Sequence, residues 1–264
     1  MTLNTTTYPY GTWAEKYPDY NVTLKTLPVN ASWSEFLEQE YEKEYFKDTE
    51  EFLSHCLKHT KGKINIYPYP DLVFNALNTT PLDEVKVVIL GQDPYFNNET
   101  HNNKAIPQAM GLSFSVPTGM DIPSSLKNIY KNMIANKQLT TPPTHGNLSS
   151  WASQGCLLLN TALTVQHGYP DSHKKHWTSF TNSLIKYISD KCENVIFVLW
   201  GGSSLSKLGL IDDKKHKILI SSHPSGLSYD KPLRTYKSFK ESNHFKEIND
   251  YLKEKGKTEI LWKL

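Results

Sequence analysis

Residues 85–95 read VKVVILGQDPY, and this stretch decides how the chain folds. Its first half is an almost unbroken run of β-branched and aliphatic residues, which is typical of a strand buried on both faces of a parallel sheet. The run stops at Gly91, where glycine permits a turn closed to other residues, and Pro94 fixes the next backbone angle. The turn presents polar side chains at the carboxyl end of the strand, where α/β sheets bind ligands. These side chains are Gln92, Asp93 and Tyr95.

Three later segments have the same form, an apolar strand that runs into a polar or glycine-bearing turn. They are residues 156–159, 195–200 and 218–220, and helical patterns lie between them. The repeated strand–helix–strand order predicts an α/β fold, a single domain with a central four-stranded parallel twisted sheet and helices on both faces. The strand ends would then meet at one edge of the sheet. They carry Asp93, Asn160, Gly202 and His223.

Two segments outside this repeat have no clear periodicity. Residues 1–30 mix Thr, Pro and Tyr, so we expect an irregular or partly disordered N-terminal arm, followed by the main domain at 31–264. Residues 97–107 are polar and rich in asparagine, which predicts a long mobile loop after the first strand.

The charge of the chain is balanced overall but unevenly distributed. The 264 residues contain 29 Lys and Arg and 27 Asp and Glu, a formal net charge of +2. Residues 1–60 carry ten acidic and five basic side chains, a net of −5, whereas residues 171–246 carry thirteen basic and seven acidic, a net of +6. The second region is a candidate surface for phosphate, with a solvated lysine-rich surface as the alternative.

The cysteine and histidine patterns give no metal site. Cys56, Cys156 and Cys192 are odd in number and far apart, which favours free thiols in a reducing compartment. His55 and His59 share a helical turn with Cys56 but lack a fourth ligand, so we predict no metal. No segment has the length of a signal peptide or a membrane span. We expect an intracellular monomer with no membrane contact, and the sequence does not distinguish cytoplasm from nucleus.

Four motifs in fixed order carry a resemblance to a known family. They are GQDPY at 91–95, GLSFSV at 111–116, LLLNTALTV at 157–165 and HPSGLS at 223–228. Together they closely resemble the signature segments of the family 1 uracil-DNA glycosylases, and the similarity runs from about Trp33 to Leu264. The resemblance implies a monofunctional glycosylase that flips uracil out of single- or double-stranded DNA and hydrolyses its N-glycosidic bond without a cofactor, leaving an abasic site.

The resemblance also implies roles for residues in the motifs. Asp93 matches the carboxylate that orients the water and faces the cationic sugar, and His223 matches the residue that hydrogen-bonds the departing uracil. The base itself would be bound by the backbone of Gln92, the amide of Asn160 and the ring of Phe114. Tyr95 matches the wall that excludes a C5 methyl group. Read singly, each has an ordinary structural explanation, such as a turn, a strand-end cap or a core aromatic residue.

A second group is expected to contact DNA. Leu227 aligns with an apolar wedge that fills the vacated stack, and Ser125, Ser225 and the turn at Gly202 align with segments that compress the DNA backbone. Arg234, the only arginine in the chain, lies on the same loop as Leu227 and is a candidate phosphate contact. A proteinaceous uracil mimic and replication proteins are further candidate partners.

Several positions depart from the family pattern. Phe96 stands where the family usually has His, residues 97–107 form an insertion, and glycine replaces the usual Ser and Pro at 202 and 226. Two other functions therefore compete with uracil excision. A non-catalytic DNA-binding relative would not need Asp93, Asn160 or His223, and a glycosylase for another base would differ at Tyr95 or Asn160. A dinucleotide-binding protein is disfavoured, since no G-x-G-x-x-G follows a strand.

Overall fold

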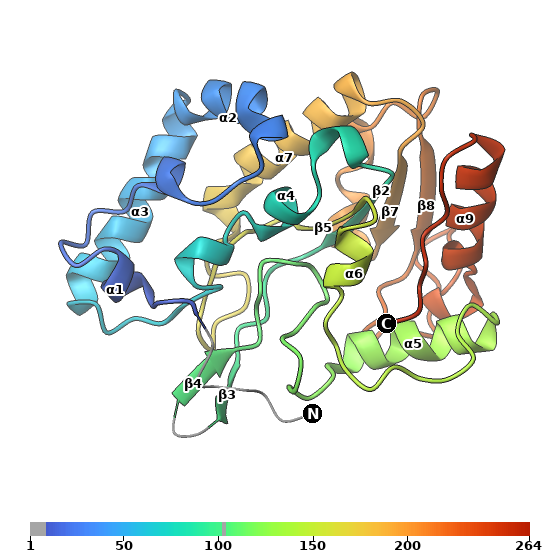
Figure 1. Cartoon of the computed structure of the whole chain (residues 1–264), viewed down its shortest axis with the longest axis horizontal. Coiled ribbons are helices and arrows are strands. Elements are labelled where there is room, and N and C mark those ends of the chain that lie inside the picture. The colour runs from blue at the N-terminus through green and yellow to red at the C-terminus, as the bar shows by residue number, and fades with distance from the viewer. Residues whose placement is uncertain (1–8, 102–103) are drawn as a thin grey trace.

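The computed structural model describes residues 9–101 and 104–264. Within them, a central sheet has four parallel strands in the order β5–β2–β7–β8 (Figure 1). The strands are β2 (Val87–Gly91), β5 (Cys156–Asn160), β7 (Ile196–Trp200) and β8 (Lys217–Ser221). Their register pairs Gly91 with Asn160 and Trp200 with Ser221. The predicted α/β sheet is confirmed, and the four polar turns leave from the same edge.

The pattern of burial explains which segments became strands. Every residue of β2, β5 and β7 is buried, in agreement with their unbroken apolar sequences. Strand β8 is at the edge of the sheet and is buried only at Leu219 and Ser221.

Helices cover both faces of the sheet (Figure 1). On one face, α7 (Lys174–Lys191) packs against α2 (Ser34–Tyr41) and α3 (Glu44–Thr60), with aromatic contacts between Phe36, Phe46 and Phe180. On the other, α6 (Ser149–Ala152) and α9 (His244–Glu254) meet through Trp151 and Phe245. The remaining helices are α1 (Trp13–Lys16), α4 (Asn75–Thr79), α5 (Ser124–Ala135) and α8 (Gly202–Leu205).

Short elements complete the fold. A two-stranded antiparallel ladder joins β1 (Ile66–Tyr67) to β6 (Val165–Gln166). The 3₁₀ helices are Leu24–Thr26, Ala31–Trp33, Pro70–Leu72, Leu82–Glu84, Leu208–Leu210 and Phe239–Glu241. None of the helices in the described part of the chain is long and apolar enough to cross a membrane.

The described part of the N-terminal segment lies on the domain. Trp13 is 2% exposed, and its Nε1 donates to the carbonyl of Pro68 at 3.0 Å. The N–H of Val22 donates to Oγ of Ser54 in α3 at 2.8 Å. Residues 9–30 are thus mostly irregular but held in place, while residues 1–8 of the predicted arm lie outside the described residues.

The insertion after the first strand contains two paired strands, so the prediction of a long loop without strands at 97–107 is wrong. Strands β3 (Asn98–His101) and β4 (Lys104–Pro107) pair antiparallel. Ile106 is fully buried, and the hydroxyl of Tyr69 donates to the carbonyl of Ala105 at 3.3 Å. The buried residues of β4, Ile106 and Pro107, are adjacent, so the hairpin lacks the alternating pattern by which an amphipathic strand is recognised.

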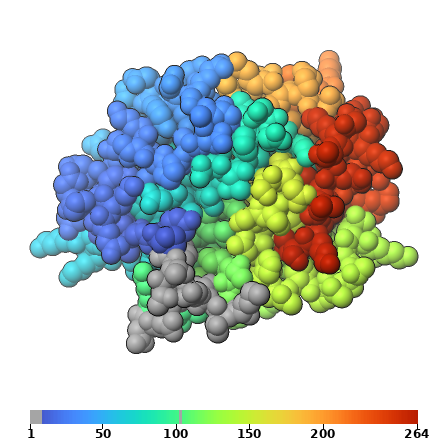
Figure 2. All heavy atoms as spheres, viewed as in Figure 1, coloured from blue at the N-terminus to red at the C-terminus, as the bar shows by residue number. Residues whose placement is uncertain are grey.

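The acidic region lies apart from the C-terminal part of the basic region, although α7, at the start of the basic region, packs against α2 and α3. Figure 2 shows the described residues of the acidic first quarter of the chain, in blue, on one side of the molecule. The residues around α9, in red, lie on the other, with the middle of the chain between them. The acidic N-terminal region is therefore separated from the C-terminal part of the basic region.

Candidate active site

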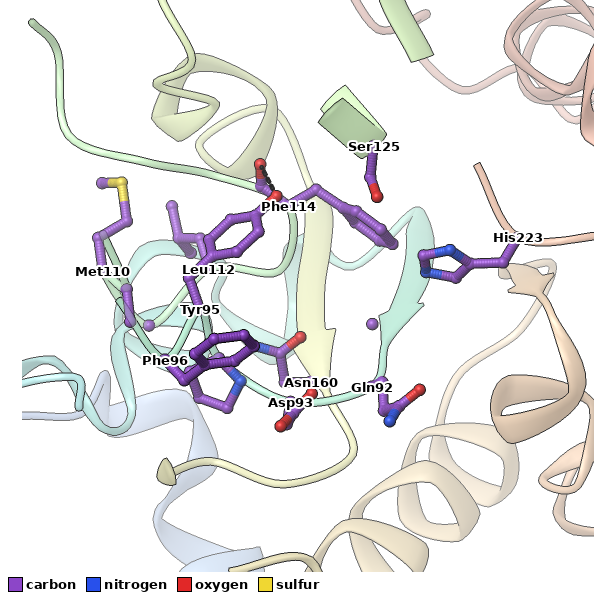
Figure 3. A pocket seen from close by; sticks show the side chains of 14 residues that line it. Gln92, Asp93, Tyr95, Phe96, Met110, Leu112, Phe114, Ser125, Asn160 and His223 are labelled. Carbon is purple, nitrogen blue, oxygen red and sulfur yellow. Dashed lines mark hydrogen bonds between the residues drawn. The ribbon is translucent and has the colours of Figure 1, made fainter. Parts of the chain in front are cut away.

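A pocket of about 220 Å³ lies at the carboxyl edge of the sheet. Side chains from β5, the turn after β2, the 109–114 segment, the start of α5 and the loop after β8 point into it (Figure 3). They include all six residues predicted to act on the base: Gln92, Asp93, Tyr95, Phe114, Asn160 and His223. The sequence-based prediction that these residues come together is therefore correct, whereas their individual roles remain predictions.

The turn after β2 is fixed by its neighbour, the turn after β5. The N–H of Thr161 donates to the carbonyl of Gly91 at 3.0 Å. The N–H of Ala162 and the hydroxyl of Thr161 both donate to the carbonyl of Gln92, at 3.0 and 2.7 Å. Glycine is required at 91 because a Cβ there would lie 2.2 Å from Oδ1 of Asn160. The amide of Asn160 is therefore packed directly against the backbone that carries Asp93.

Asp93 is a partly buried carboxylate with a backbone donor. Its Oδ2 accepts a hydrogen bond of 2.8 Å from the N–H of Asp171. Burial raises the pKa of Asp93, the hydrogen bond from Asp171 opposes that rise, and the Asp171 carboxylate adds to it. The Asp171 carboxylate also accepts from Nε2 of Gln92 at 2.8 Å. The sequence did not single out Asp171, which now belongs to the candidate site.

The loop after β8 sets the protonation of His223. The N–H of Ser225 donates to Nδ1 of His223 at 3.0 Å, so Nδ1 is the acceptor and the ring proton is on Nε2. Burial lowers the pKa of His223 to about 4, so the ring is neutral at neutral pH. A neutral imidazole with Nε2–H is a hydrogen-bond donor that needs no titration near neutrality.

Aromatic residues form the apolar part of the pocket. The ring of Phe114 is 9% exposed, and its centroid is 5.8 Å from that of His223 and 5.5 Å from that of Trp200. The backbone of Phe114 is left-handed, with φ of 62°. Its carbonyl accepts a hydrogen bond of 3.3 Å from the hydroxyl of Tyr95, drawn as a dashed line in Figure 3. The hydrogen bond therefore joins Tyr95 to the segment that carries Phe114.

Comparisons with known proteins agree on one family. The family model described as "Uracil DNA glycosylase superfamily" matches residues 77–253. The chain belongs to this superfamily.

Similar proteins carry the same description. A uracil-DNA glycosylase of Pseudomonas paraeruginosa is 45% identical over 240 residues, which cover 90% of this chain and 96% of that protein. A probable uracil-DNA glycosylase of Acanthamoeba polyphaga mimivirus is 38% identical over 273 residues, covering 99% and 72% of the two proteins. The crystal structure of the mimivirus uracil-DNA glycosylase aligns over 100% of this chain and 97% of its own, with a TM-score of 0.93. Two structures of mimivirus variants are complexes with UGI.

Membership of the uracil DNA glycosylase superfamily assigns the reaction. The chain is a hydrolase of N-glycosyl bonds that removes uracil from DNA in base excision repair. The family 1 resemblance of the four motifs is consistent with these matches.

Of the residues expected to contact DNA, one lines the pocket and the others lie outside its lining. Ser125, at the start of α5, lines the pocket, and Ser225 is half-buried beside His223. Gly202 is exposed as the first residue of α8. Leu227 is 83% exposed at the tip of the loop after β8. Arg234 is exposed on a two-residue turn closed by hydrogen bonds between Leu233 and Tyr236.

The structure also accounts for the departure at residue 96. Phe96 lines the pocket and packs with the buried cluster of Tyr67, Tyr69, Ala109 and Val165. Its carbonyl accepts from the N–H of Gly168 at 3.0 Å. Phe96 is thus an apolar anchor for the turn rather than a polar group for the substrate.

No group of three or more His, Cys, Asp or Glu side chains in residues 9–101 and 104–264 could hold a metal ion. His55 and His59 do share a helical face, with ring centroids 5.8 Å apart. Cys56, Cys156 and Cys192 are free thiols.

Proposed function

We propose that the pocket binds an extruded uracil and that Asp93, Asn160 and His223 carry out its recognition and release. The observation that supports this proposal is the convergence of an amide, a carboxylate and a neutral imidazole on one pocket of about 220 Å³, each from the end of a different strand. The target bond is inaccessible in a stacked duplex, so the nucleotide has to leave the helix before it can react.

The base is recognised by hydrogen bonds and by shape. The amide of Asn160 has a donor and an acceptor, which match the O4 and N3–H of uracil and are mismatched to cytosine. Among the described residues it makes no side-chain hydrogen bond that would compete. Phe114 stacks on the base, and Tyr95, held by the carbonyl of Phe114, fills the space next to C5. A methyl group at that position would collide with the Tyr95 ring.

The chemical step breaks the bond between C1′ of the sugar and N1 of the base. The bonding electrons leave with uracil, and the negative charge that develops on O2 is stabilised by Nε2–H of His223. The sugar acquires oxocarbenium character, which the ionised carboxylate of Asp93 stabilises. Asp93 also orients a water molecule. As this water adds to C1′, it gives up a proton to the Asp93 carboxylate. The products are uracil and an abasic site, and every atom is supplied by substrate and water.

The rim of the pocket holds the DNA. In this proposal Leu227 enters the base stack in place of the extruded uracil, and its 83% exposure makes it available without rearrangement of the core. Ser125, Ser225 and the N–H groups at Gly202 contact phosphates next to the uracil, and Arg234 meets a phosphate farther along. Residues 31–264 form the catalytic domain, and residues 1–30 are an arm on its surface.

Partners and location follow from the substrate. We propose action on both single- and double-stranded DNA, in an intracellular compartment and as a monomer. Since mimivirus relatives form complexes with UGI, we propose that such a protein, as a mimic of the substrate, also binds this pocket. No cofactor takes part in the proposed reaction.

A base-release assay tests the proposal. The purified protein, with a chelator present, is incubated with oligonucleotides that contain one uracil, one cytosine or one mismatched thymine. Release of uracil alone is expected. Asn160→Ala should lose most uracil release, while failure of the wild-type protein to release uracil would disprove the function. Unchanged uracil release by Asn160→Ala would remove Asn160 from recognition.

A further inference from the structure

The segment between β6 and α7 reaches back to the catalytic turn through one residue. The backbone N–H of Asp171 donates to Oδ2 of Asp93 at 2.8 Å, and the Asp171 carboxylate accepts from Nε2 of Gln92 at 2.8 Å. A single residue thus holds two consecutive side chains of the turn. Its φ of 58° places it in the left-handed region, which Asp and Asn tolerate better than most residues.

Asp171 brings a charge as well as two hydrogen bonds. A second carboxylate next to Asp93 disfavours the ionised form of Asp93, whereas Nζ of Lys174, 3.5 Å from Oδ1 of Asp171, favours it. Asp171 and Lys174 therefore act on Asp93 with opposite signs. Their side chains are 45% and 46% exposed, so solvent reduces the effect of both.

We propose that Asp171 is a positioning residue for the catalytic turn: its backbone fixes the carboxylate of Asp93, and its side chain, balanced by Lys174, sets how much negative charge Asp93 presents to the sugar. The proposal rests on the function proposed for Asp93 and adds a residue that the four sequence motifs do not contain.

Other charged groups near the turn do not provide this balance. On the β8 side, His223 is neutral because burial lowers its pKa to about 4. Beyond α8, Lys207 is buried, and its Nζ donates to Oδ1 of Asn182 at 2.8 Å. Burial lowers the pKa of Lys207, and the positive charge of Lys174 lowers it further. Among the residues that the structure describes, Asp171 and Lys174 are the charged side chains that act on Asp93.

Asp171→Asn separates charge from structure. Asparagine keeps the backbone N–H, tolerates the left-handed backbone and still offers an oxygen to Gln92, so only the charge is lost. Without that charge Asp93 ionises more readily, and the acid limb of kcat/KM against pH should move to lower pH by roughly half a unit. Lys174→Gln should move the same limb to higher pH. The substrate is a single-stranded uracil oligonucleotide at fixed ionic strength.

Asp213→Asn is the matched control. Asp213 is exposed, lies four residues before β8 at the opposite edge of the sheet, and carries the same charge. It should leave the limb in place. An unchanged limb in Asp171→Asn, or equal shifts in Asp171→Asn and Asp213→Asn, would overturn the proposal.

Asp93→Asn distinguishes the proposed role of Asp171 from the proposed role of Asp93 on which it depends. Loss of activity in Asp93→Asn together with an unmoved limb in Asp171→Asn would reject only the role of Asp171. Full activity in Asp93→Asn would reject the role of Asp93 and the inference with it. Asp171→Gly keeps the backbone N–H that donates to Asp93 but removes the carboxylate that accepts from Gln92. This variant should show the same shift of the acid limb and, in addition, a lower kcat. A pH profile identical to that of Asp171→Asn would contradict a role for the hydrogen bond to Gln92.

Discussion

The turn after β2 and the loop after β8 face each other across the pocket but are held very differently. The carbonyls of Gly91 and Gln92 and the carboxylate of Asp93 are all occupied by donors from other segments. The loop after β8 is held mainly by hydrogen bonds within itself, such as that from the hydroxyl of Ser222 to the carbonyl of Ser228 at 2.7 Å, and by Nδ2 of Asn128 in α5, which donates to the carbonyl of Pro224 at 2.7 Å. Its tip, at Leu227, is 83% exposed. The fixed side suits chemistry, in which small displacements are costly, and the exposed side suits contact with DNA.

The largest effect on the rate of uracil release should come from a substitution in the turn after β2. Asp93→Asn retains the shape of the side chain and removes the charge that we propose stabilises the sugar cation, so the single-turnover rate of uracil release should fall by about 10²- to 10³-fold. Affinity for uracil-containing DNA should be retained, as measured by binding under conditions without turnover. A near-wild-type rate would mean that this side of the pocket is not where the sugar cation is stabilised.

A smaller effect is expected on base selection. Tyr95→Ala should raise the ratio of thymine to uracil release by roughly 10- to 200-fold, because the proposed exclusion of the C5 methyl group by the Tyr95 ring is steric. Ile106 in β4 is fully buried and belongs to the cluster against which Tyr95 packs. Ile106→Ala should therefore raise the same ratio to a lesser extent.

Ile248→Ala provides the comparison for Ile106→Ala. Ile248 is equally buried but lies in α9, away from the pocket. Both variants lose stability by about 2–5 kcal/mol. Thymine release that rises equally in both would indicate general loosening, and the hairpin would then have no part in selection.

The contribution of the exposed loop after β8 should depend on whether the DNA is duplex or single-stranded. Leu227→Ala should slow uracil release from duplex roughly tenfold, because the cost of unstacking is no longer offset, and should have little effect on single strands, where that cost hardly exists. Rates on matched duplex and single-stranded oligonucleotides provide the measurement. Equal losses on both would refute the wedge.

The smallest effect is expected at Arg234, which does not line the pocket. Arg234→Ala should reduce the slope of log binding constant against log salt for duplex DNA by about 1, without altering base preference. A titration across a salt series measures it. Thr235→Ala, on the same turn, should leave the slope unchanged. An unaltered slope in Arg234→Ala would place this residue outside the interface.

The strands and the strand-end residues of the pocket could be predicted because both depend on local sequence, whereas Phe114 was expected only from the family resemblance. Buried parallel strands have unbroken apolar runs, and the rule that their carboxyl ends share an edge brought Asp93, Asn160 and His223 together. Other features depend on contacts between distant segments. The hairpin at 98–107 is held by Tyr69 and by burial of Ile106, and the tie from Asp171 to Asp93 spans 78 positions. The left-handed backbone of Phe114 also gave no signal, since glycine is the usual marker of that conformation.

The cross-bonding of the turns after β2 and β5 has a consequence for protein engineering. The carbonyls of Gly91 and Gln92 accept from Thr161 and Ala162, and no side chain fits between Gly91 and the amide of Asn160. Asn160 and the turn that carries Asp93 are thus parts of one unit. A chimera that exchanges residues 91–93 with those of a relative should keep its activity only when residues 160–162 are exchanged as well.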